Sequence, residues 1–153
     1  MISNINKAKL IFITLILDIL TFYTLYTNEL NKLDKTFSIV VLLTHLIFYI
    51  SLIMNKKKIL DILHIFCFFL VSFSVYLENI NLLLIGLLLI VIIQILWRLE
   101  NKCILMDDGD TFGYGKTIDI ITLIITILLL EHIQFCVCQK LKKIFQTLIL
   151  IIK

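Results

Sequence analysis

The chain has 153 residues with a formal net charge of +3, and 61% of its residues are hydrophobic. Its mean hydropathy of +1.08 is far above that of a water-soluble domain, in which about 45–50% of residues are apolar. The 16% of residues that are charged are too few to form the polar shell of a soluble domain. These figures exclude a cytosolic enzyme, a disordered chain and a basic nucleic-acid-binding protein. They predict an integral membrane protein whose first partner is the lipid bilayer.

Residue usage gives a second signal, about origin. Ile accounts for 31 residues and Lys for 13, whereas Ala and Arg occur once each and Pro is absent. Residues with A/T-rich codons therefore greatly outnumber those with G/C-rich codons. This bias predicts an A/T-rich genome, such as that of a large DNA virus, an organelle, a mollicute or an apicomplexan.

Apolar stretches divide the chain into membrane-crossing segments. A spanning helix needs about 17–25 apolar residues, and lipid leaves helices as the default because the backbone must satisfy its own hydrogen bonds. Short connections make sequential helices antiparallel neighbours. We therefore expect one membrane domain over 1–153, an all-α bundle of four to five antiparallel transmembrane helices. The expected spans are 10–26, 37–54, 59–77, 82–97 and 118–138.

The remaining segments are a long loop over 98–117 and a tail over 139–153, which we expect to lie in the membrane interface. Lys and Arg near the spans number eight on the N-terminal side and six on the other, which favours a cytoplasmic N-terminus. Five spans would then place the basic tail outside. This conflict leaves open whether 118–138 crosses the membrane or lies in the interface.

Asp18 lies in the middle of the first span, where a charge costs at least about 2.5–3.5 kcal/mol on insertion scales. Thr14, Asp18 and Thr21 recur at helical spacing and share one face. His45, in the antiparallel second span, lies at the same depth, about 14 Å from the same membrane face. Equal depth predicts a contact between Asp18 and His45.

Two further ionisable groups, Asp61 and His64, lie on one side of the third span, about 6 Å or more nearer that face. The interpretation that we favour is a buried polar pair that fixes helix packing. The alternatives are a proton relay through Asp18, His45, His64 and Asp61, and side chains that reach the lipid headgroups.

Cysteines near the end of the fifth span form a second cluster. Cys136 and Cys138 precede three lysines, Lys140, Lys142 and Lys143, a pattern that suits S-acylation if this segment faces the cytosol. A helix turns about 200° between the two cysteines, so both cannot face one metal ion with His132. We expect no metal site and no cofactor.

The long loop carries a short filter-like sequence. The run from Thr111 to Gly115, with Gly113 between, resembles the T-x-G-Y-G selectivity filter of potassium channels and lies between two spans. The preceding Met106–Asp110 segment is acidic rather than a pore helix, and Lys116 stands where a filter often has Asp. These departures argue against a filter. Asp107, Asp108 and Asp110 could bind a divalent cation, but their spacing does not match an EF-hand, so a solvated acidic turn is favoured.

The start of the same loop carries another resemblance. Trp97, Asn101, Cys103 and Leu105 form W-x-x-x-N-x-C-x-L directly after a span. This pattern resembles a segment of small, uncharacterised multi-span membrane proteins of giant DNA viruses, over about ten residues. The resemblance implies a viral origin, in the virion or an internal host membrane, and implies no known activity.

No nucleophile–base pair, phosphate-binding loop or haem motif occurs in the sequence, so we do not expect an enzyme. We expect a structural or assembly component of a viral or organellar membrane that associates with other membrane or capsid proteins or with itself. A proton- or ion-conducting bundle built on Asp18, His45 and His64 is the alternative. A small subunit of an organellar respiratory complex is the third.

Overall fold

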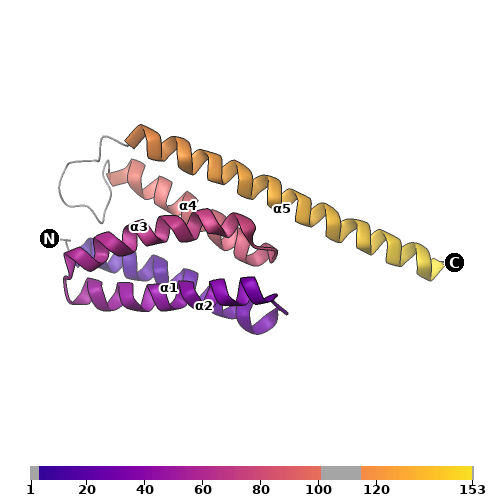
Figure 1. Cartoon of the computed structure of the whole chain (residues 1–153), viewed down its shortest axis with the longest axis horizontal. Coiled ribbons are helices and arrows are strands. Elements are labelled where there is room, and N and C mark those ends of the chain that lie inside the picture. Colours follow the sequence, from indigo (N-terminus) through magenta and orange to yellow (C-terminus); the bar gives the residue numbers. More distant parts are fainter. Residues whose placement is uncertain (1–3, 101–114, 153) are drawn as a thin grey trace.

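The computed structural model describes residues 4–100 and 115–152, and within these ranges the chain is entirely helical apart from short connections (Figure 1). The described part contains no strand, so the all-α fold class expected from the sequence is confirmed. The elements are α1 (Asn4–Thr27), α2 (Lys32–Ile53), α3 (Lys57–Phe73), the 3-10 turn η1 (Ser74–Tyr76), α4 (Ile80–Glu100) and α5 (Gly115–Ile152).

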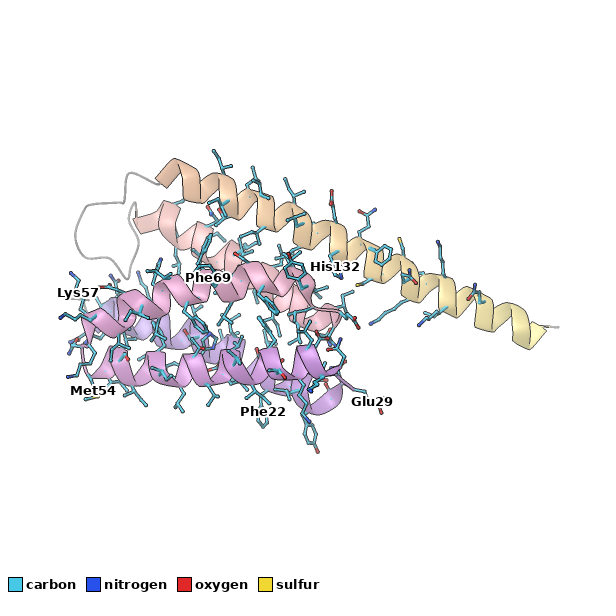
Figure 2. All side chains as sticks on the ribbon, viewed as in Figure 1. Phe22, Glu29, Met54, Lys57, Phe69 and His132 are labelled. Atoms are coloured by element: carbon cyan, nitrogen blue, oxygen red, sulfur yellow. The ribbon has the colours of Figure 1, made fainter. Side chains whose placement is uncertain are left out.

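The helices have the length and apolar surface of membrane spans. Four segments are long and apolar enough to cross a bilayer: Asn4–Thr27, Lys32–Ile53, Lys57–Tyr76 and Ile120–Ile144. Helix α4 has a shorter described apolar part, Ile80–Leu96. Large apolar side chains point outward over the whole bundle, as Phe22 and Phe69 do in Figure 2. The chain is therefore an integral membrane helical bundle.

The bundle has two ends. The first end holds the start of α1, the α2–α3 connection and the end of α4, and the second holds the α1–α2 and α3–α4 connections (Figure 1). Helix α1 packs on α2 and α4, α3 follows α2, and α5 packs on α4. Sequential helices are thus antiparallel neighbours, because the connections between the first four are short.

The main apolar core lies where α3, α4 and α5 meet near the second end. Its buried side chains are Val71, Leu77, Leu82, Leu83, Ile90, Ile125 and Leu129. The buried face of α1 is mostly polar instead, with Thr14, Thr21 and Thr24 beside Leu17. The Thr14 and Thr24 hydroxyls donate to the carbonyls of Leu10 and Leu20, at 2.8 and 2.9 Å. These hydroxyls are thereby satisfied without water.

Helix α5 continues through the boundary that the sequence suggested. Its 38 residues would be about 57 Å long, far more than the roughly 30 Å of a bilayer core. The segment 139–153 is therefore not a separate short helix, because its described residues continue α5 beyond the bundle (Figure 1). Its location in the interface stays a prediction. Of the expected loop over 98–117, residues 98–100 belong to α4 and 115–117 to α5, and the rest lie outside the described residues.

Gly86 is the point of closest approach between α4 and η1. A Cβ at this position would lie 2.8 Å from Oγ and 3.2 Å from Cβ of Ser74, which is fully buried. The Ser74 hydroxyl donates to the Val71 carbonyl at 2.6 Å, so it is held in place. Small residues at such contacts let helix backbones approach closely in membranes.

Replacing Gly86 should therefore separate α4 from the α3–η1 segment. We expect Gly86→Val to lower the free energy of unfolding by about 1–3 kcal/mol, a typical cost of overpacking. Thermal unfolding in detergent micelles measures this, with Leu84→Val, an outward-facing position on α4, as control. Adding Ser74→Ala to Gly86→Val should restore part of the loss. Equal stability of Gly86→Val and the unmodified chain would contradict this account of the contact.

Candidate intramembrane polar site

Asp18 faces the second helix from the edge of the buried threonine face of α1. Helical spacing places it one turn beyond Thr14, which is buried, and its own side chain is 18% exposed. It is fourteen residues into α1, roughly 20 Å along the helix axis from Asn4, and therefore deep within a bilayer core of about 30 Å.

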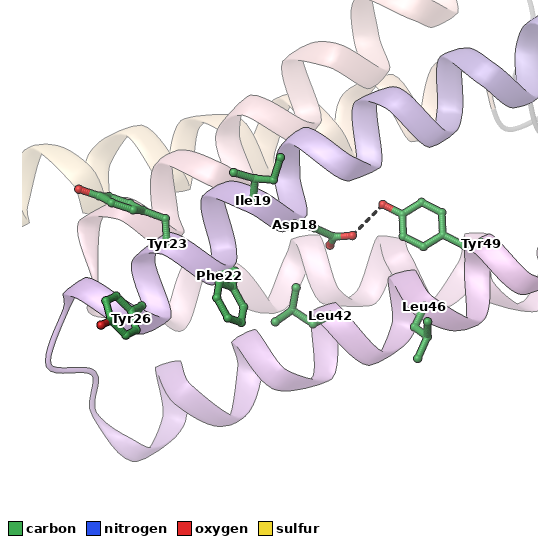
Figure 3. A pocket seen from close by; sticks show the side chains of 8 residues that line it. All are labelled: Asp18, Ile19, Phe22, Tyr23, Tyr26, Leu42, Leu46 and Tyr49. Atoms are coloured by element: carbon green, nitrogen blue, oxygen red, sulfur yellow. Dashed lines mark hydrogen bonds between the residues drawn. The ribbon is translucent and has the colours of Figure 1, made fainter.

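Two side chains of α2 hold its carboxylate. Nδ1 of His45 lies 2.5 Å from Oδ1 of Asp18, the contact that equal depth predicts. The hydroxyl of Tyr49 donates to Oδ2 at 2.7 Å (Figure 3). His45 and Tyr49 are four residues apart, so both project from the same face of α2. We refer to Asp18, His45 and Tyr49 as the triad.

The sequence analysis missed Tyr49. The available signal was the spacing of His45 and Tyr49, which places a second hydrogen-bond donor one turn from the first and on the same face. Tyrosine is common in apolar segments and near membrane interfaces, so its presence alone indicates no particular partner.

The chemistry of the triad follows from its donors and acceptors. A carboxylate accepts about four hydrogen bonds, and here two positions are occupied. The imidazole can donate or accept at either nitrogen, so the triad can hold a proton or face a cation.

Asp61 and His64 both lie on α3 and are half-buried. Among the described residues no hydrogen bond or ion pair joins Asp61 to Asp18 or His45. His45 also borders a void of about 40 Å³, which Cys67 of α3 also lines. The structure therefore brings Asp18 and His45 together, and the continuation of a relay through His64 and Asp61 stays a prediction.

An open groove runs along the outside of α1 and α2 beside the triad (Figure 3). Its volume is about 510 Å³, and aliphatic and aromatic side chains form its walls. The lining residues are Asp18, Ile19, Phe22, Tyr23, Tyr26, Leu42, Leu46 and Tyr49. Ile19, Phe22 and Tyr23 are more than half exposed, so the groove faces the surroundings of the bundle rather than its core.

The buried carboxylate of Asp34 joins two segments of the chain at the second end of the bundle. Asp34, 2% exposed, accepts hydrogen bonds from the backbone N–H groups of Glu78 at 3.2 Å and Asn79 at 2.9 Å. It lies in the first turn of α2, which the side chain of Asn31 caps at 2.7 Å. Asp34 thus joins the start of α2 to the connection that leads into α4.

Sequence reasoning missed Asp34 because the second span was expected to begin only at residue 37. The missed signal is the Asn31-x-x-Asp34 pattern, an N-cap residue followed by an acidic residue in the first helical turn. The N–H groups that Asp34 accepts from are 44 and 45 residues away, a pairing that no local pattern indicates.

Gln94 makes another hydrogen bond between helices within the apolar region. Its amide Nε2 donates to Oγ1 of Thr122 at 2.7 Å, which links α4 to α5. This contact was also missed, although Gln94 is a lone amide within an apolar stretch. Such a residue in a membrane helix favours a partner on a neighbouring helix.

The cysteine cluster lies level with the second end of the bundle. Sγ of Cys136 is 4.0 Å from the carbonyl oxygen of Glu78, in the connection before α4. Cys138 is exposed, as are the lysines that follow it. S-acylation of Cys136 or Cys138 stays a prediction. Within residues 4–100 and 115–152, no three His, Cys, Asp or Glu side chains gather closely enough to hold a metal ion.

The loop residues that the sequence singled out can be placed only in part. Trp97 belongs to α4 and Gly115 is the first residue of α5, whereas Cys103 and Gly113 lie outside the described residues.

Comparison of the chain with protein-family models, with curated proteins and with solved structures found no match. The geometry of the site is therefore the basis for any functional argument.

The role of Asp34 can be tested by removing its carboxylate. We expect Asp34→Ala to lower the free energy of unfolding by about 3 kcal/mol, because two backbone N–H groups lose their acceptor. A fully formed hydrogen bond to a charged group contributes about 1.5–3 kcal/mol. Asp34→Asn keeps one acceptor oxygen and should lose less. Thermal unfolding in detergent measures both, with Glu29→Ala, an exposed carboxylate in the α1–α2 connection, as control. A loss no larger than that of the control would show that Asp34 does not hold this end together.

Proposed function

We propose that this protein is a structural or assembly component of a membrane, which acts by associating with other membrane proteins rather than by catalysis. The observation that carries the proposal is how the polar side chains within the helices are used. Several, such as Thr14 and Thr24, bond to their own helix backbone, and others bond to a neighbouring helix, as in the triad and the Gln94–Thr122 pair. Such contacts specify packing more than they add stability, at about 0.6 kcal/mol each on average.

Helix α5 supports the same proposal. It extends well beyond the other helices (Figure 1), and side chains such as Phe135, Leu141 and Ile144 are exposed along it. A helix that continues past its own bundle offers surface that the bundle does not cover. Association with another membrane component would cover such surface.

The membrane that we propose is viral or organellar. The excess of Ile and Lys over Ala and Arg, and the resemblance of the segment from Trp97 to Leu105 to giant-virus membrane proteins, support the viral alternative. An organellar genome would share the residue bias, and a small subunit of a respiratory complex remains within this proposal.

The proposal predicts a stable complex in the native membrane. After extraction in a mild detergent, the protein should migrate on a native gel well above the size of a monomer in its micelle, together with other membrane or capsid proteins. Co-migration with an intact respiratory complex would identify the organellar alternative. Migration as a monomer, with no co-purifying membrane protein, would contradict the proposal.

A proton-conducting bundle is the second candidate, and the triad is the observation that favours it. An ionisable pair deep in a membrane span is a common feature of proton pathways. Proteoliposomes with an internal pH dye should then acidify after an external acid step, and Asp18→Asn should abolish this flux. Tyr49→Phe removes the hydrogen bond from the Tyr49 hydroxyl but keeps the Asp18 carboxylate. Glu131→Gln, which changes an exposed carboxylate on α5, is the control. Equal leak in liposomes with and without the protein would exclude conduction.

A further inference from the structure

The side chains that contact the Asp18 carboxylate are a phenol and an imidazole, and neither carries a permanent positive charge. The imidazole of His45 is a counterion to Asp18 only when it is protonated. Charged groups in membrane spans pair with one another or face a partner, because an isolated charge is costly there.

In α1 to α4, Lys and Arg lie at the helix ends and not at the depth of Asp18: positions 7 and 9 in α1, 32 and 35 in α2, 57 and 58 in α3, and 98 in α4. In α5 the lysines lie at its start, position 116, or at 140, 142 and 143, beyond Cys136, which is level with the second end of the bundle. At 1.5 Å per residue, Lys9 is already about 14 Å from Asp18 along the axis. The described residues of a second copy therefore offer no ammonium or guanidinium group at this depth.

The carboxylate is reachable from outside the bundle through the groove between α1 and α2. Asp18 and Tyr49 form part of its lining, and the remaining walls are apolar or aromatic (Figure 3). The groove follows α1 for about two turns, from Asp18 to Tyr26, toward the second end. Aromatic faces beside a carboxylate suit a cationic side chain on an apolar stem, because rings attract cations at close range.

We propose that this groove docks a transmembrane helix of another protein, one that carries a Lys or Arg near the middle of the bilayer. The cation would pair with the free acceptor positions of Asp18, and the apolar faces of the two proteins would pack along the groove. This inference rests on the proposed function, since it names the chemistry of the partner that such a component would bind.

A synthetic helix provides the test. The full chain, with a donor fluorophore at its C-terminus, is reconstituted in phosphatidylcholine vesicles with an acceptor-labelled Leu/Ala helix of about 24 residues carrying one central Lys. The reference peptide has Leu in place of Lys. We expect energy transfer to report about tenfold tighter association of the Lys peptide, in the range of coupling energies of close charge pairs.

Substitutions locate the binding surface. Asp18→Asn should remove the preference for the Lys peptide, and Leu42→Trp, which fills the groove without touching the carboxylate, should weaken association of both peptides. Glu131→Gln should behave as the unmodified chain. Helical circular dichroism and thermal unfolding of each variant separate loss of binding from loss of folding.

The outcomes distinguish this inference from the proposed function. Equal association of the Lys and Leu peptides, or a preference that survives Asp18→Asn in a folded protein, would overturn the docking of a cationic helix. Energy transfer between copies of the chain that Leu42→Trp abolishes would assign the groove to self-association instead. A complex from native membranes that is unaffected by Asp18→Asn would overturn the groove while leaving the assembly role intact.

Discussion

The structure depends on one constraint, which is that hydrocarbon offers no hydrogen-bond partner to a polar group. The backbone satisfies itself by forming helices, and buried hydroxyls such as those of Thr14 and Thr24 return to their own carbonyls. Within the described part of the chain, no buried side-chain nitrogen or oxygen lacks a partner. The role of each buried polar side chain in the bundle therefore depends on the group to which it is hydrogen-bonded.

Two carboxylates meet this constraint in different ways. Asp34, at one end, accepts from two backbone N–H groups and is fully buried, so it fastens that end and is closed to an outside partner. Asp18, deep in α1, accepts from His45 and Tyr49 and still borders an open groove. The same chemical group is thus structural at one depth and accessible at another. This difference in exposure is the basis for the partner binding that we propose at Asp18.

Small and polar side chains add to the apolar core in attaching α4 and α5 to the bundle. In lipid, apolar side chains gain little by leaving a surface that is already apolar, so close packing and hydrogen bonds decide which helices associate. Gly86 lets α4 approach Ser74, and Gln94 joins α4 to Thr122 of α5. The C-terminal part of α5 lies beyond these contacts, and this is the surface for which we propose association with other membrane components.

The sequence by itself determined membrane residence, helical structure, the approximate spans and the shared depth of Asp18 and His45. Depth follows from counting residues, because an α-helix rises 1.5 Å per residue. Tertiary structure alone decided the role of Tyr49, the pairing of Asp34 with the distant connection before α4, and the approach at Gly86. In α1 the shared face of Thr14, Asp18 and Thr21 indicates which side is buried. Helix α4 is apolar on nearly all faces, so which of its sides faces a neighbour is settled only when the helices pack.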